Sequence, residues 1–248
     1  MEPQLKPIPI DNSRPTWSPT QGFGRTDLPG VATGDQNKVL RNTYWLLALS
    51  MLPTIAGALF GMSLDFAAFY KASPIAAPLL TLAAMFGMLF LVQALRNSSW
   101  GVLAVFGFTF VSGMMLAPTL QYAAHLKNGG QLVALAGGMT AAVFFVMATI
   151  ATVSKRDFSF MGKFLMIGVV LLIIASIANL FLQVPALAVT VSAVAVLIFS
   201  AFLLYDVSSI VRGGQTNYIM ATVSLFLDIL NIFMSLLNLL MMFSGQRD

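Results

Sequence analysis

Seven long apolar segments dominate this chain of 248 residues and leave it few ways to fold. Each segment is close to the roughly 20 residues that a helix needs to cross a lipid bilayer. Apolar residues make up 58% of the chain and charged residues 9%, which is more apolar surface than a water-soluble domain of this size can bury. The sequence therefore predicts an all-α polytopic membrane protein. The seven expected transmembrane helices are 43–63, 74–95, 100–121, 131–153, 162–182, 186–210 and 218–243.

Turn-forming and charged residues separate these segments, as in Arg96-Asn97-Ser98-Ser99 and Arg212-Gly213-Gly214. The shortest connections define their boundaries least well, so six helices with a re-entrant segment is the main alternative to seven. The basic residues indicate the orientation. With the N-terminus inside, all but three of the thirteen Lys and Arg residues fall on cytosolic segments, which agrees with the positive-inside rule. We therefore expect a cytoplasmic N-terminus and a C-terminus on the opposite side.

The first 36 residues differ in composition from everything that follows. They have no apolar periodicity and are rich in glycine and proline. The prolines are Pro3, Pro7, Pro9, Pro15, Pro19 and Pro29. Such a segment cannot bury enough apolar surface to offset the entropy lost on ordering. The sequence predicts a disordered cytosolic tail over residues 1–36 and a transmembrane domain over 37–248.

A polar stripe runs along the last expected helix. It consists of Ser224, Asp228, Asn231, Ser235 and Asn238, separated by 4, 3, 4 and 3 positions, so all five share one helix face. An unsatisfied polar group in lipid costs several kcal/mol, so this face must meet protein or a water-filled cavity. We expect the C-terminal helix to be central and the other helices to pack around it. The uncharged stripe residues, together with Tyr205 in the preceding apolar segment, are candidates for lining a pore.

Asp206 and Asp228 are the only acids inside the expected helices, and they flank one short loop, 211–217. Ionisable residues in membrane segments are costly and are typical of functional sites. The alternative is structural: a buried acid satisfied by Ser, Asn or Arg that fixes helix register. Two carboxylates close together in a low-dielectric site resist carrying two charges, so we expect the pair to hold a shared proton and to titrate as a unit. With Tyr205 and Asn231 they could act as transient oxygen ligands for Ca²⁺, which usually takes six to eight.

Several other classes of site are excluded or disfavoured. The chain has no cysteine and a single histidine, His125, which excludes thiolate and histidine-rich metal sites. Nucleotide-binding and zinc-protease motifs are absent, and the net charge of +4 follows the membrane, so nucleic acid is not an expected partner. Tyr205-Asp206 matches half of the signature of presenilin-like intramembrane proteases, but Asp228 lacks the Gly-x-Gly that would complete it. Aspartyl proteolysis is thus a remote alternative, and we expect neither an enzyme nor a cofactor.

Several separated motifs resemble the Bax inhibitor-1 family and span about residues 38–243. Two further segments, Lys38 to Tyr44 and Gly213 to Ile219, look most like the bacterial branch that modulates the membrane protease FtsH. The family motifs are Phe108-Thr109-Phe110-Val111-Ser112-Gly113-Met114-Met115-Leu116-Ala117-Pro118, Lys155-Arg156-Asp157-Phe158-Ser159-Phe160, Leu203-Leu204-Tyr205-Asp206 and Ser224-Leu225-Phe226-Leu227-Asp228-Ile229-Leu230-Asn231-Ile232-Phe233.

This resemblance implies seven helices wrapped around the last one, in a bacterial inner membrane. In family members that leak calcium it implies a pH-sensitive aspartate pair, matched here by Asp206 and Asp228, and a basic latch that closes the pore, matched by Arg96. The main expectation is thus a pH-sensitive calcium leak. The alternative is a partner of FtsH with no transport role, which binds the protease through its N-terminal tail. An acid that some members carry in the second helix has no counterpart, because Leu82 to Gly87 is uncharged.

Overall fold

The computed structural model describes residues 34–64, 68–69, 72–73, 76–154 and 156–245. The described residues all belong to the second of the chain's two units, Ala32–Asp248. The predicted tail, residues 1–36, lies outside the described residues up to position 33 and stays a prediction. Residues 34–36 already belong to the first helix.

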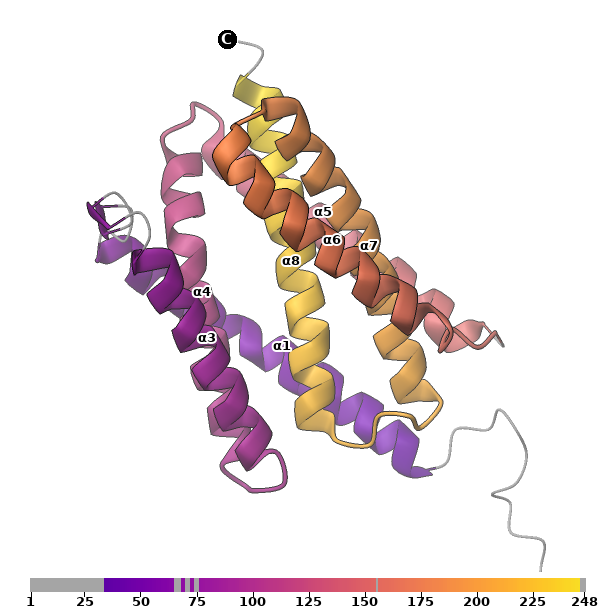
Figure 1. Cartoon of the computed structure of the whole chain (residues 1–248). Helices are drawn as coiled ribbons and strands as arrows, with labels where there is room; N and C mark the ends of the chain where they lie inside the picture. Colours follow the sequence, from indigo (N-terminus) through magenta and orange to yellow (C-terminus); the bar gives the residue numbers. More distant parts are fainter. Residues whose placement is uncertain (1–33, 65–67, 70–71, 74–75, 155, 246–248) are drawn as a thin grey trace, which may run out of the picture. The chain divides into compact units, whose positions relative to one another are not determined.

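The described part of the second unit contains seven α-helices and no strand (Figure 1). Six of them are long and apolar enough to cross a membrane, which confirms the all-α membrane class. The exception is α3, whose apolar stretch Leu79–Leu95 is shorter, so the seventh crossing stays a prediction. The helices are α1 (Gly34–Ser63), α3 (Ala76–Leu95), α4 (Gly101–Ala124), α5 (Gly129–Val153), α6 (Met161–Leu182), α7 (Pro185–Val211) and α8 (Tyr218–Gly245).

The helix ends follow the turn signals in the sequence closely, with one exception. Helix α7 begins at Pro185, where the fixed φ of proline suits the first helical position. Helix α6 ends at Leu182 and is followed by Gln183, which adopts a left-handed φ of 51°. The exception is α1, which begins at Gly34, well before the expected start at 43. Apolar residues mark where a helix enters the membrane, and polar residues such as Lys38 and Asn42 continue the same helix outside it.

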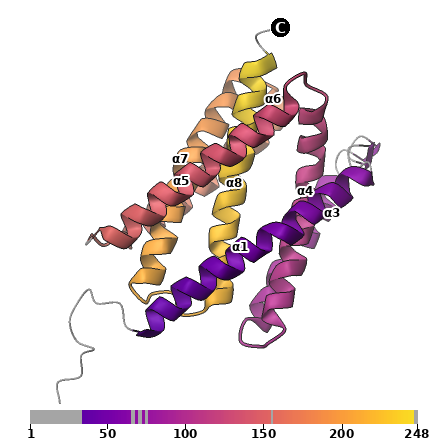
Figure 2. The same ribbon diagram turned by 180° about the vertical axis from the view of Figure 1, so that it is seen from behind.

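Helix α8 lies in the middle of this unit, as the polar stripe predicted (Figures 1 and 2). Within the described residues it contacts every other helix except α6. Phe226 of α8 packs edge-to-face against Phe108 of α4, with ring centroids 5.7 Å apart. The Thr222 hydroxyl donates a hydrogen bond of 3.4 Å to the Thr43 carbonyl of α1. The described part of α6, by contrast, packs against α7 alone.

The tightest helix pair is α1 with α4, and glycines make it possible. Gly57 of α1 lies directly against the backbone of Phe110, and Gly113 of α4 lies against the backbone of Thr54. Small residues let helix backbones approach closely in membranes. Gly137 and Gly138 of α5 make no such contact, because a side chain at either position would meet no atom within 4 Å.

Candidate functional site

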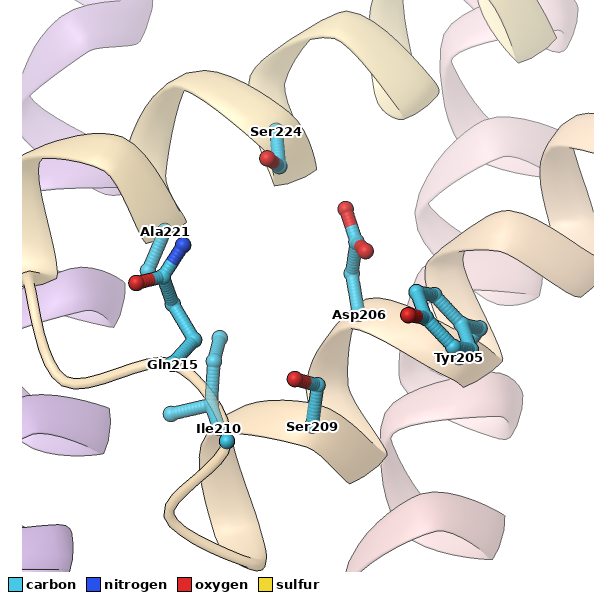
Figure 3. Close-up of a pocket in the computed structure, with 8 residues that line it drawn as sticks. Tyr205, Asp206, Ser209, Ile210, Gln215, Ala221 and Ser224 are labelled. Carbon is cyan, nitrogen blue, oxygen red and sulfur yellow. The ribbon is translucent and has the colours of Figure 1, made fainter. Parts of the chain in front are cut away.

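A polar cavity of about 260 Å³ lies where α7 ends and α8 begins (Figure 3). The loop between these helices turns at Gly213, whose φ of +78° favours glycine. Asp206 of α7 and Ser224 of α8 face each other across the cavity, close enough for the hydroxyl to donate a hydrogen bond to the carboxyl. The cavity is lined by Tyr205, Asp206, Ser209, Ile210, Gly214, Gln215, Ala221 and Ser224.

The second acid, Asp228, lies one helical turn beyond Ser224 and is almost fully buried, with 6% of its surface exposed. It is close enough to Asp206 for the two carboxyls to interact electrostatically. Its Oδ2 atom is buried and has no hydrogen-bond partner among the described residues. A buried polar atom without a partner is costly, and such atoms are rare in folded proteins. The structure therefore places the two predicted acids together, and leaves one of them with an unused oxygen.

The rest of the stripe leads from this cavity towards the other end of α8. Asn231 turns its amide back and donates a hydrogen bond of 2.8 Å to the Leu227 carbonyl, and Ser235 is buried. Asn238 reaches a second cavity of about 660 Å³ between the ends of α4, α7 and α8. This second cavity is lined by Pro118, Thr119, Tyr122, Pro185, Val189, Asn238, Met241 and Met242.

The remaining predicted residues are placed as follows. Tyr205 lines the first cavity, and its ring lies about 3.0 Å from where a Cβ on Gly162 of α6 would stand. Arg96 lies in the loop between α3 and α4 with an exposed side chain. Its backbone carbonyl accepts a hydrogen bond of 3.0 Å from the amide of Asn217, just before α8. The roles of a latch for Arg96 and of a pore lining for the stripe stay predictions.

The described residues contain no cluster of three or more His, Cys, Asp or Glu side chains that could hold a metal ion. Asp206 and Asp228 would therefore offer Ca²⁺ two acidic side chains, with Ser224 nearby, where six to eight oxygens are usual. The arrangement suits brief contact with a passing hydrated cation better than storage.

A third acid lies in an exposed loop outside the cavity and is held by local hydrogen bonds. Asp157, between α5 and α6, accepts a hydrogen bond of 2.9 Å from the Ser159 N–H. Hydrogen bonds from Ser159 and the nearby Arg212 charge hold the pKa of the Asp157 carboxyl below its usual value. This carboxyl is fully exposed, so it belongs to the loop and not to the cavity.

Comparison with known proteins decides the family. The family described as inhibitor of apoptosis-promoting Bax1 matches residues 36–245, which is most of the chain. The chain belongs to this Bax inhibitor family. The resemblance found in the separated motifs is thereby confirmed.

Relatives within the Bax inhibitor family cover nearly the same length. The modulator of FtsH protease YccA from Escherichia coli is 41% identical over 205 residues, or 82% of this chain and 90% of that protein. The same relative in another Escherichia coli strain is named inner membrane protein YccA. An uncharacterised membrane protein of Vibrio cholerae is 40% identical over 84% of this chain and 91% of its own length. An uncharacterised protein of Neisseria meningitidis is 40% identical over 86% and 95%.

Sequence reasoning missed three polar residues of the first cavity and its surroundings: Ser209 and Gln215 in the cavity wall and Asn217 beside it. Ser209 and Gln215 carry no signal that distinguishes them from ordinary residues at a helix end. Asn217 did carry one, because asparagine immediately before an apolar helix is a preferred capping residue. Its Oδ1 accepts hydrogen bonds from the N–H groups of Ile219 and Met220, each 3.1 Å long.

Proposed function

We propose that this chain is a non-enzymatic integral membrane modulator of an FtsH-type membrane protease. The observation that carries the proposal is its 41% identity with the Escherichia coli modulator, which extends over 90% of that protein. A match of this length spans most of both chains, which supports a shared role. The polar, proline-rich residues 1–36 supply a segment suited to partner binding, because such segments bind by ordering on a partner.

This proposal predicts that the full chain co-purifies with the FtsH protease of its own cell in mild detergent and changes the rate at which that protease degrades a membrane substrate. A variant lacking residues 1–31 should melt like the full chain, because the second unit starts at Ala32, and should bind the protease more weakly. Absence of binding by the full chain would contradict the modulator role. A truncated chain that fails to fold would contradict the independence of the tail.

We further propose seven membrane crossings, with the N-terminus in the cytoplasm and the C-terminus outside. Six helices have sufficient length, and α3 would be the seventh and shortest crossing. The first cavity and the loop after α3 would then face the cytoplasm. Most Lys and Arg residues lie in segments that this topology places in the cytoplasm, which supports the orientation.

The orientation can be tested because the chain contains no cysteine. Ser99→Cys and Asn128→Cys place one thiol in each of two exposed loops, before α4 and before α5. A membrane-impermeant maleimide added to intact spheroplasts should label the thiol at position 128 and leave the thiol at position 99 unlabelled. Permeabilised cells should label both and serve as the control. The reverse pattern would invert the topology, and labelling of both in intact cells would rule out an odd number of crossings between them.

A second candidate function is a pH-sensitive leak of cations such as calcium, gated by Asp206 and Asp228. The observation that favours it is the polar cavity lined by Asp206, which interacts with the buried Asp228, and the polar stripe that runs from there to a second cavity. The two functions are compatible with each other. Calcium flux into liposomes that contain the purified chain, measured from pH 6 to 8, tests the leak without the protease present.

A further inference from the structure

Asn217 joins two parts of the fold that are otherwise weakly connected. Its backbone carbonyl accepts the first hydrogen bond of α8, from the Ala221 N–H at 3.0 Å. Its side-chain oxygen caps the N–H groups of Ile219 and Met220. Its side-chain nitrogen remains available to donate outwards. One amide can therefore serve two purposes at once, with the oxygen ordering the start of α8 and the nitrogen reaching another loop.

The nitrogen reaches the corner between α3 and α4. It donates hydrogen bonds of 3.0 Å each to the Arg96 carbonyl and to the Oδ1 atom of Asn97. The first turn of α8 packs against the same corner. The Ile219 side chain lies against Gly101, where an added Cβ would also fall within 2.7 Å of the Leu95 carbonyl oxygen. The end of α3, the start of α4 and the start of α8 thus meet around one amide group.

Helix α3 depends on this corner more than the other helices do. Among the described residues it packs only against α4 and α8, and its contact with α8 is the slighter of the two. Most of its side chains are exposed or partly exposed, and Val92 in its last turns is fully buried. An element with few buried contacts opens locally at lower free energy than the core. Removing two hydrogen bonds at its end should therefore free α3 before it disturbs the rest.

The loop that carries Asn217 also forms the wall of the cavity. Gln215 lines the cavity, and its Oε1 atom accepts the Asn217 backbone N–H at 3.4 Å. A shift of the α3–α4 corner is thereby transmitted through Asn217 to the rim of the cavity next to Asp206. This connection holds whether the cavity serves a leak, a partner protein or only the fold.

We propose that Asn217 is a releasable clasp that holds the end of α3 against α8 and keeps the rim of the Asp206 cavity in its closed arrangement. When the two donated hydrogen bonds break, α3 swings away from α8, Val92 becomes accessible to water, and the rim moves with the loop. The helix cap is a separate function of the same side chain and does not depend on the clasp.

Asn217→Ser separates these two functions. Serine is as good a helix cap as asparagine, but its side chain is too short to reach the Arg96 carbonyl. Serine is preferred to aspartate because a new carboxylate beside Arg96 would form an ion pair that replaces the lost contact. Asn217→Ala removes both cap and clasp and shows what loss of the cap adds. The full chain in liposomes is used throughout.

The readout is the reaction of a single buried thiol with N-ethylmaleimide. Val92→Cys reports on α3, and Val207→Cys, on the fully buried face of α7, is the matched control. We expect Asn217→Ser to raise the labelling rate at position 92 about tenfold, as two lost hydrogen bonds imply, and to leave position 207 protected. Equal rates at position 92 with and without Asn217→Ser overturn the clasp. A rise at both positions also overturns it, because the whole bundle has then loosened.

A second measurement does not depend on a buried substitution. Spin labels on Ser99→Cys and Thr216→Cys, which are both exposed, span the clasp from loop to loop. The distance distribution should be narrow with Asn217 present and should broaden and lengthen with Asn217→Ser. An unchanged distribution overturns the proposal even if the buried thiols cannot be introduced.

Discussion

Replacing Gly113 with alanine is expected to destabilise the protein by about 3 kcal/mol, at the upper end of the usual range for overpacked cores. The new methyl group would overlap the Thr54 carbonyl oxygen and would stand about 3.0 Å from the Ala58 nitrogen. These atoms belong to the backbone of α1, which cannot rotate away as a side chain can. Helices α1 and α4 must therefore move apart along their closest contact. Thermal unfolding in detergent should show a lower Tm by several degrees.

The matched control is Gly138→Ala in α5. A Cβ at this position meets nothing within 4 Å, and alanine favours a helix by about 1 kcal/mol over glycine. We expect an unchanged or slightly higher Tm. If both variants lost the same stability, the glycines would act through helix flexibility, and the close approach of α1 and α4 would not explain the effect.

Calcium flux through liposomes that contain this protein is expected to change between pH 6 and 8, and Asp206→Asn or Asp228→Asn is expected to abolish that change. The two carboxyls lie close enough to interact, and the proposed gate requires that they titrate as a pair. Asparagine keeps the size and the hydrogen bonds of the side chain but cannot titrate. Arg96→Ala should instead raise basal flux, because it removes the proposed cationic latch and leaves the pair intact.

Two control variants test whether the pH response belongs to this pair. Asp157→Asn should leave the profile unchanged, because hydrogen bonds from Ser159 lower the pKa of the Asp157 carboxyl. A lowered pKa keeps that group charged throughout the range, and its contribution is lost only well below pH 6. His125→Gln, which removes the single histidine of the chain, should likewise leave the profile unchanged. Unchanged pH profiles in both aspartate variants would rule out the gate and favour the role of protease modulator alone.

The sequence predicted the helices well because the same apolar runs that place a helix in lipid also end at charged or turn-forming residues. It predicted that Asp206 and Asp228 belong together because one short loop joins their helices. It could not distinguish Gly113, which lies against the backbone of another helix, from Gly138, where an added Cβ would meet nothing within 4 Å, since both are small residues in apolar runs. The contact of Asn217 with Arg96 was also beyond reach, because the two residues are 121 positions apart and neither pattern nor spacing links them.

The central position of α8 has a consequence for biosynthesis. Proteins emerge from the ribosome N-terminus first, so α8, which within the described residues touches every other helix but α6, is made after all of them. Until it enters the membrane, α1, α4, α5 and α7 face a site that no segment fills, and Asp206 lacks the neighbour it meets in the finished protein. A chain that stops short of residue 218 therefore lacks its centre, not merely its end. We expect every such incomplete product to be short-lived in the cell, because its remaining helices lack the helix they pack around.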